Sequence, residues 1–228
     1  MILILGGTST THKIISQLNS DDFMISVATE YGRDEFSKRY PKKLTLKRFT
    51  VAELAKFIRF NNIEQVIDTT HPHAKEISKV AIEACKLTGI DYTSEVRELE
   101  DIEYENMYQF YTYEDAVAHI EKNSYKSVLI TTGGNNIDKF SSVAEVSYAR
   151  VLAFEKSIKA CTDAGFHYSR IIGMQGPFSE EFNLALMKEL KTDCLVTKNS
   201  GEGSGYSEKI SACEKMDIDV IVINPQQV

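Results

Sequence analysis

Met1-Ile2-Leu3-Ile4-Leu5-Gly6-Gly7-Thr8-Ser9 opens the chain and decides its fold class. Residues 2–5 are apolar without interruption, which is typical of a strand buried on both faces of a parallel sheet. The glycines follow at once, and Ile14, Ile15 and Leu18 then recur at helical spacing. The stretch therefore predicts a strand, a glycine turn and a helix.

The glycine turn also predicts a phosphate-binding site. Glycine lets backbone N–H groups approach an anion closely, and the helix dipole favours negative charge at the N-terminus. We expect the phosphates of a dinucleotide to contact Gly6, Gly7, Thr8 and Ser9. Thr11 or His12 stands where the dinucleotide fingerprint has its third glycine. A tight turn without a ligand is therefore the alternative, and the absence of Gly-Lys-Ser/Thr excludes a phosphate-loop kinase.

Composition limits the classes of partner. The 228 residues contain no apolar run of about 18 residues that could span a bilayer and no basic leader, so we expect a cytoplasmic protein without a membrane partner. The net charge of −7 argues against nucleic acid, although a local basic pocket can still bind an acidic small molecule. The four cysteines lack Cys-x-x-Cys spacing and are expected to be reduced core residues without a metal: Cys85, Cys161, Cys194 and Cys213.

The second predicted strand, 23–29, ends at an acidic residue. Glu30 lies roughly twenty residues after the glycines, where a carboxylate would hydrogen-bond the adenine ribose and favour NADH. Arg33 could instead hold a 2′-phosphate and favour NADPH. Solvated loop charges are the alternative for both residues, so the choice between NADPH and NADH stays open.

A polar cluster follows the next predicted strand. A helix at 51–60 precedes a strand at 65–67, and Asp68-Thr69-Thr70-His71-Pro72-His73 comes directly after it. Pro72 suits the first turn of a helix that Gly89 can close. Open α/β sheets bind ligands at the carboxyl ends of their strands, so we expect Thr69 and His71 to face a cofactor. A capped helix with surface histidines is the alternative, and a metal held by the two histidines lacks a third ligand nearby.

The second half repeats the alternation of strands and helices. Val128–Ile130 is an apolar strand followed by a second phosphate-competent turn that contains Thr132 and Gly133. Arg150 lies in the next strand, and Ser179 is a good N-cap for a helix. The predicted strands are 128–130, 146–152, 171–172, 194–196 and 220–223, and the predicted helices are 155–164, 180–190 and a segment around 210–213.

A glycine-rich polar loop follows the strand at 194–196. Its backbone N–H groups, one hydroxyl and one cation can be presented to an anion. The residues expected to do so are Lys198, Asn199, Ser200 and Gly201. A plain surface loop is the alternative. Lys209 is expected to be a solvated helix charge, and a cation that neighbours this loop is the alternative for it.

Several ordered motifs together resemble the precorrin-6A reductase and cobalt-precorrin-6A reductase family of cobalamin biosynthesis. Residues 68–74 are similar to its Asp-Ala-Thr-His-Pro-Phe-Ala segment, and 128–133 to a strand that ends in Thr-Thr-Gly. Residues 149–152 resemble its arginine-containing strand, and 176–179 its Gly-Pro-Phe-Ser segment. Residues 193–201 are the closest match, to an Asp-x-Leu-Val-Thr-Lys-x-Ser-Gly signature of the family.

The resemblance implies reduction of one double bond of precorrin-6A, or its cobalt form, to precorrin-6B with NADPH or NADH. The substrate is a polycarboxylate tetrapyrrole, for which Arg97, Arg150 and Lys198 are the expected cationic partners. Lys198, His71 or water would supply the proton, so Lys198 and His71 are the candidate catalytic residues.

Two departures from the family keep an alternative open. Thr10-Thr11-His12 replaces Glu-Ala-Arg, and in Ser94-Glu95-Val96-Arg97 only the last residue of Arg-x-Glu-Arg is kept. A non-catalytic dinucleotide-binding sensor is therefore the second hypothesis. A short-chain dehydrogenase is disfavoured because no Tyr-x-x-x-Lys pair occurs; Tyr206 and Lys209 are one residue too close.

The predicted fold class is α/β, with two Rossmann-like lobes whose parallel sheets are flanked by helices. We expect an N-terminal dinucleotide-binding lobe over residues 1–97 and a C-terminal lobe over 98–228, with a ligand cleft between them. The sequence does not indicate an oligomeric state.

Overall fold

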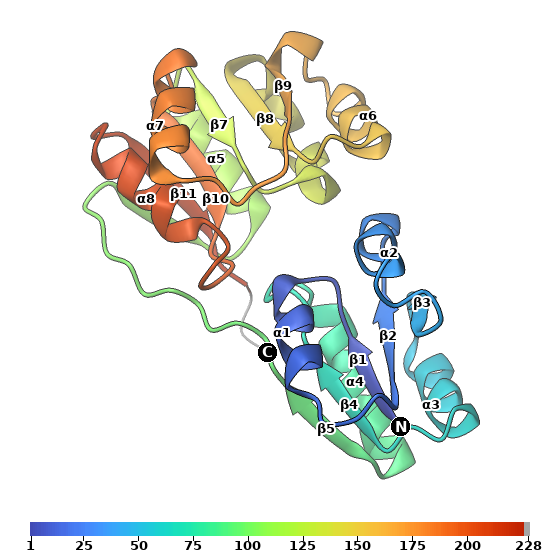
Figure 1. Ribbon diagram of the computed structural model, residues 1–228. Coiled ribbons are helices and arrows are strands. Elements are labelled where there is room, and N and C mark those ends of the chain that lie inside the picture. The colour runs from blue at the N-terminus through green and yellow to red at the C-terminus, as the bar shows by residue number, and fades with distance from the viewer. Residues whose placement is uncertain (226–228) are drawn as a thin grey trace. The chain divides into compact units, whose positions relative to one another are not determined.

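The computed structural model describes residues 1–225. The chain divides into two compact units, Met1–Glu98 and a second that begins at Leu99 (Figure 1). Each unit contains one sheet in which every strand pair is parallel, with helices on both faces. The predicted α/β class with two parallel sheets is confirmed.

The first unit holds a sheet with strand order β3-β2-β1-β4-β5. Its strands are β1 (Ile2–Leu5), β2 (Phe23–Val27), β3 (Leu44–Leu46), β4 (Gln65–Asp68) and β5 (Asp91–Ser94). Its helices are α1 (Ser9–Gln17), α2 (Glu30–Ser37), α3 (Val51–Phe60) and α4 (Lys75–Thr88).

Alternating residues of β1 pack on opposite faces of this sheet. Leu3 and Leu5 join the core under α3 and α4, whereas Ile4 joins the core under α1 and α2. Leu3 and Ile4 are fully buried and Leu5 is nearly so, which explains why this strand is apolar at each of its positions.

The second unit holds a sheet with strand order β6-β11-β10-β7-β8-β9. Its strands are β6 (Met107–Phe110), β7 (Val128–Ile130), β8 (Ser147–Val151), β9 (Ile171–Gly173), β10 (Cys194–Lys198) and β11 (Asp219–Ile223). Its helices are α5 (Tyr113–Asn123), α6 (Glu155–Asp163), α7 (Glu180–Glu189) and α8 (Tyr206–Glu214), with 3₁₀ segments at Gly134–Val146 (η1) and Tyr168–Arg170 (η2).

The two faces of the second sheet carry different helices. Val128, Ile130 and Val196 face a core closed by α5, η1 and α6. Leu129 and Leu195 face the opposite core under α7 and α8. Cys161, Cys194 and Cys213 are buried free thiols in these two cores, and Cys85 is one in the core of the first unit under α3 and α4, as predicted.

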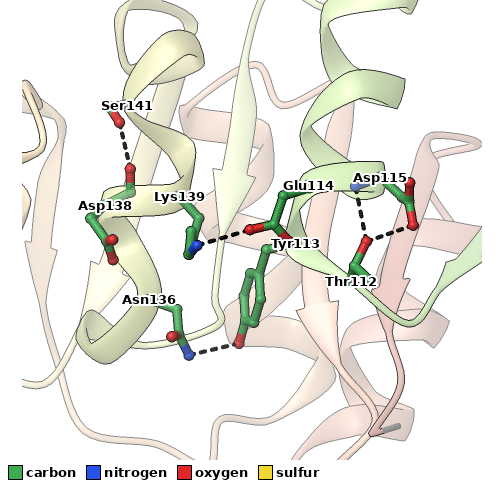
Figure 2. A network of polar contacts seen from close by, with 8 residues as sticks. All are labelled: Thr112, Tyr113, Glu114, Asp115, Asn136, Asp138, Lys139 and Ser141. Carbon is green, nitrogen blue, oxygen red and sulfur yellow. Dashed lines mark hydrogen bonds and ion pairs between the residues drawn. The ribbon is translucent and has the colours of Figure 1, made fainter.

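Polar contacts join the start of α5 to η1 (Figure 2). Thr112 caps α5 by accepting the Asp115 backbone N–H at 3.1 Å. Lys139 forms an ion pair with Glu114 at 2.8 Å, and Asn136 donates to the Tyr113 hydroxyl at 3.1 Å. These contacts hold η1, which follows the turn at 131–133, against α5 near the carboxyl edge of the sheet.

The predicted helix starts and ends are partly confirmed. Gly89, with φ of 74°, closes α4, and Ser179 caps α7 by accepting the Phe182 N–H. The expectation that Pro72 lies in the first turn of a helix is wrong, because α4 begins at Lys75. Residues 71–74 instead form a turn in which the Ala74 N–H donates to the His71 carbonyl at 2.7 Å, with the proline at its second position.

Asp68, the last residue of β4, is a fully buried carboxylate with four donors. It accepts from the backbone N–H and hydroxyl of Thr70 at 2.9 and 2.6 Å, from the Ser78 hydroxyl at 2.6 Å and from the Tyr92 hydroxyl at 2.9 Å. The carboxylate thereby ties the end of β4 to α4 and β5, and it raises the pKa of Tyr92 together with burial, the larger cause.

We predict that Asp68→Ala lowers the free energy of unfolding by about 3 kcal/mol, because it leaves the buried Thr70 hydroxyl and the partly buried Ser78 and Tyr92 hydroxyls without their acceptor. Urea unfolding followed by circular dichroism measures the change. Asp91→Ala, which alters an exposed carboxylate at the start of β5, is the matched control and should change stability by less than about 0.5 kcal/mol. Equal stability of the two variants would contradict the assigned role of Asp68.

Candidate functional site

Each sheet has one point where the strand order reverses. In the first unit the chain leaves β1 toward β2 on one side and returns to β4 on the other. In the second unit the same reversal separates β7 from β10. Ligands of open α/β sheets bind at such switch points, outside the carboxyl ends of the strands. The turns at 6–9 and 69–71 meet at the first point, and those at 131–133 and 198–201 at the second.

The glycine turn after β1 is built around Thr11. Its hydroxyl accepts the backbone N–H groups of Gly7 and Thr8 at 3.2 and 3.4 Å, and its methyl group would lie 3.0 Å from a Cβ atom added at Gly6. Gly7 has φ of 125°, and a Cβ atom there would meet no atom within 4 Å. The turn therefore needs glycine at both positions, while open space remains above Gly7.

A chain of hydroxyl groups ties this turn to the end of β4. The fully buried Thr69 hydroxyl donates to the Leu5 carbonyl at 2.8 Å and lies 2.8 Å from the Thr11 hydroxyl. The Thr8 hydroxyl donates to the Thr69 carbonyl at 2.8 Å. Thr69, predicted to face a cofactor, thus supports the turn from within the protein. The Gly7 and Thr8 N–H groups are engaged by Thr11, so Ser9 and Thr10 carry the helix N–H groups that lack intrahelical acceptors.

Arg97 lies at the N-terminus of α1. Its guanidinium donates to the hydroxyls of Ser9 and Thr10, the latter at 3.3 Å. Desolvation lowers the pKa of Arg97, and none of the ion pairs found in residues 1–225 involves it. A guanidinium at the positive end of a helix dipole is unfavourable until an anion is added. The residue predicted for substrate binding is therefore positioned beside the predicted phosphate turn.

Glu30 and Arg33 lie in the first turn of α2, which the sequence prediction had treated as a loop. Thr29 caps this helix by accepting the Gly32 N–H at 3.1 Å. Glu30 and Arg33 form an ion pair with each other, and Arg33 also lies 3.5 Å from Asp34. Both side chains are exposed at the carboxyl end of β2. The two side chains predicted to distinguish NADH from NADPH are thus paired with each other.

His71 follows the hydroxyl-rich end of β4 in the turn at 71–74. Its Nδ1 accepts the backbone N–H of His73 at 3.2 Å. A neutral His71 therefore carries its proton on Nε2, since this tautomer is assigned by the hydrogen bond. The two imidazole rings lie 5.5 Å apart, and no group of three or more His, Cys, Asp or Glu side chains suited to a metal occurs within residues 1–225.

The switch point of the second unit begins with the turn after β7. Thr131 donates to the Val196 carbonyl through both its backbone N–H and its hydroxyl, at 2.8 and 2.9 Å, and thereby joins β7 to β10. Gly133 follows with φ of 85°. The buried hydroxyl of Thr132 has no hydrogen-bond partner within the described chain. This second predicted turn thus has an unsatisfied polar group beneath it.

Lys198 ends β10 at the same edge. Burial lowers the pKa of its ammonium group to about 8, and no carboxylate forms an ion pair with it in residues 1–225. A lysine whose pKa lies near neutrality can bind an anion as a cation or transfer a proton. Lys198 is the strongest candidate among the predicted catalytic residues.

The loop after Lys198 is held by buried contacts. The Asn199 side chain accepts the backbone N–H of Glu100 at 3.1 Å and donates to the Glu100 carbonyl at 2.7 Å. Ser200 is 8% exposed, and Gly201 has φ of 76°. Asn199, predicted to bind substrate, thus anchors the loop to the segment that contains Glu100.

Arg150 lines a cavity of about 190 Å³ at the carboxyl ends of β7 and β8. Thr131, Gly133 and Lys209 line the same cavity. Lys198 is not among its lining residues. The expectation that Lys209 is a solvated helix charge is wrong, because its ammonium group is desolvated and repelled by Arg150, and its pKa is lowered to about 8.

Only a weak signal in the sequence indicated that Lys209 is desolvated. Lys209 precedes Ile210, which packs in the core under α8. A lysine next to a buried helix position lies at the boundary of the apolar face. The loop at 176–178 that covers this boundary lies far away in the sequence and is not revealed by helical periodicity.

The comparisons with known proteins agree in family and fold. The family model described as "Precorrin-6x reductase CbiJ/CobK" matches residues 1–228. The chain is 31% identical to a cobalt-precorrin-6A reductase from Priestia megaterium, over 98% of this chain and 89% of that protein. It is 29% identical to a precorrin-6A reductase from a Sinorhizobium species, over 97% of this chain and 84% of that protein.

A solved structure of a CobK precorrin-6A reductase has the same fold. Its TM-score is 0.81 at 21% identity, and the match covers 100% of this chain and 88% of that one. No helix within residues 1–225 has the length and apolar character needed to cross a membrane. The full-length family match and the curated relatives establish that the chain belongs to the precorrin-6x reductase CbiJ/CobK family.

Proposed function

We propose that this protein uses NADPH or NADH to reduce one double bond of cobalt-precorrin-6A, or of precorrin-6A, in cobalamin biosynthesis. The observation that carries the proposal is the meeting of the glycine turn, α1 and Arg97 at the switch point of the first unit. The names of the relatives supply the substrate class. The reaction consumes one hydride and one proton and releases the oxidised nicotinamide and the dihydro product.

The residues of the first unit fit a dinucleotide. Open space above Gly7 leaves room for a phosphate, and the Ser9 and Thr10 N–H groups with the Arg97 guanidinium provide donors beside it. Glu30 or Arg33 would contact the adenosine ribose or its 2′-phosphate. The bound dihydronicotinamide supplies the hydride, and the protein supplies orientation and electrostatics.

The second unit supplies cations for a polycarboxylate substrate. Lys198 and Arg150 are desolvated cations at the carboxyl edge of its sheet. A cation that is shielded from water there forms a strong ion pair with a substrate carboxylate. The unsatisfied Thr132 hydroxyl and the turn at Gly133 lie beside the end of β10 and supply neutral donors. The loop of Ser200 and Gly201 completes the predicted substrate-binding set.

Two side chains are suited to deliver the proton. Lys198 has a pKa of about 8, so its ammonium form is populated at neutral pH yet gives up its proton readily. His71 carries an Nε2–H in its neutral form. Water is the third source that we retain for the proton.

The experiment that tests the function uses purified protein with cobalt-precorrin-6A or precorrin-6A and each nicotinamide. We expect oxidation of NADPH or NADH, followed at 340 nm, only when substrate is present, with formation of the dihydro product. Separate titrations with NADH and NADPH measure the preference. Cofactor binding without oxidation would contradict the enzyme and support a dinucleotide-binding sensor.

We predict that Gly7→Val abolishes nicotinamide binding, because the side chain occupies the space assigned to the phosphates. A fluorescence titration with NADPH measures the loss. Gly89→Val is the matched control: it also has positive φ, of 74°, and open space, but it lies at the C-terminal end of α4. Both variants carry backbone strain of about 1–2 kcal/mol, and unchanged NADPH affinity in Gly7→Val would contradict the assignment.

We predict that kcat/KM of the wild type falls as pH rises through about 8, the pKa of Lys198 in the enzyme without substrate. Lys198→Met should lower kcat/KM by about 100-fold, the scale of a general acid. Lys198→Met should not lower the free energy of unfolding at pH 7, because below pH 8 the lysine is charged in both the folded and the unfolded state and its charge is unfavourable when buried. This penalty is relieved only as the pH rises from about 8, the pKa in the folded state, to about 10.5, the pKa in the unfolded state.

Lys198→Arg separates this lysine from Lys209, whose pKa is also about 8. The arginine stays charged, so any decline in kcat/KM that persists above pH 8 in this variant comes from elsewhere. Equal loss of activity and thermal stability in Lys198→Met would make Lys198 a structural residue.

A further inference from the structure

The cavity beside Arg150 contains two cations from different elements. It lies on the α7 and α8 face of the second sheet, and its lining includes Arg150 of β8, Asn183 of α7 and Lys209 of α8. The loop that contains Phe178 closes it. No aspartate or glutamate is among its lining residues within the described chain. The lining of the cavity therefore carries two positive charges and no carboxylate, and Glu208 and Glu100, which act on Lys209, lie outside it.

Arg150 is held in place by contacts that leave most of its donors for a ligand. It is 8% exposed, its Nη1 donates to the Asn183 Oδ1 at 2.8 Å, and its guanidinium lies 4.8 Å from the centre of the Phe178 ring. Asn183 donates through Nδ2 to the carbonyls of Phe178 and Ser179, at 3.3 and 2.8 Å, so its oxygen is directed at the arginine. Asn183 is thus a positioning residue for Arg150.

Lys209 approaches the same cavity from α8. Desolvation and Arg150 lower the pKa of its ammonium group, and they outweigh Glu208 and Glu100, the carboxylates that raise it. The hydroxyl of Ser204, also part of the lining, is buried and has no hydrogen-bond partner within residues 1–225. Two desolvated cations and an unsatisfied hydroxyl are unfavourable in isolation and favourable around an anion.

We propose that this cavity binds one carboxylate arm of the substrate, with Arg150 and Lys209 as its charge partners and Ser204 as a further donor. The identity of the substrate rests on the proposed function. About 190 Å³ is smaller than the 300–1,000 Å³ of sites that enclose a whole small-molecule ligand. The cavity therefore fits a single short carboxylate arm and leaves the macrocycle outside.

The first test measures affinity for cobalt-precorrin-6A without nicotinamide, by quenching of tyrosine fluorescence. Lys209→Met should raise the Kd by about 10- to 100-fold, the effect of removing one partner from a buried charge pair. Lys188→Met, which removes an exposed lysine from α7, is the matched control and should keep the wild-type Kd. An unchanged Kd in Lys209→Met overturns the proposal.

The second variant guards against a change that is merely structural. Arg150→Lys keeps the charge but loses the planar donors, so it should weaken substrate binding while NADPH affinity stays unchanged. Removal of a desolvated cation in Lys209→Met should not lower the thermal unfolding temperature. Weaker binding of both NADPH and substrate in these variants, together with a lower unfolding temperature, would overturn the assigned role.

A third measurement separates this inference from the proposed function. Reductive ¹³C-methylation gives Lys209 an NMR signal, which is assigned by its loss in Lys209→Met. We expect glutarate, as a free carboxylate, to shift this signal; a shift by inorganic phosphate but not by glutarate would overturn the carboxylate assignment. If wild-type protein oxidises no nicotinamide but glutarate shifts the signal, the proposed function fails while the cavity's preference for carboxylate stands.

Discussion

Burial of the central strands on both faces is the constraint that organises this protein. Within β1, β7 and β10 burial disfavours polar side chains that lack a partner, so the groups proposed to bind ligands lie at or beyond the strand ends. At the carboxyl ends of β1 and β4, the hydroxyls of Thr11 and Thr69 hydrogen-bond the backbone: Thr11 accepts the Gly7 N–H, and Thr69 donates to the Leu5 carbonyl. These buried hydroxyls hold the glycine turn and leave open space above Gly7, where we propose that a phosphate binds.

The second unit meets the same constraint differently. Thr131 joins β7 to β10 through two bonds to one carbonyl, but the Thr132 hydroxyl stays unsatisfied. Lys198, Arg150 and Lys209 are desolvated cations with no ion-pair partner in residues 1–225, and each lowers stability at neutral pH. A protein that only needed to fold would place apolar residues there, so the cations are best explained by binding.

The sequence predicted the fold wherever one physical cause dominated. Unbroken apolar runs located β1, β7 and β10, and the helix at Val51–Phe60 matched its periodicity to the residue. The edge strands β3, β5 and β6 escaped detection because they are short and only partly buried, so they lack that pattern. Pro72 misplaced the start of α4, since proline suits the second position of a turn as well as the first turn of a helix.

The site was harder to predict because it is made by contacts between distant segments. Arg97 donates hydrogen bonds to Ser9 and Thr10, which lie 88 and 87 positions earlier in the chain. No local sequence pattern indicates this contact. The net charge of −7 did not indicate that Lys209 lies in a desolvated site either. This charge is spread over exposed carboxylates, whose electric field is screened within about 8–10 Å. Anion binding by an acidic protein therefore depends on a few cations that the fold removes from water. The exclusion of carboxylates from the surroundings of these cations matters more than the number of cations.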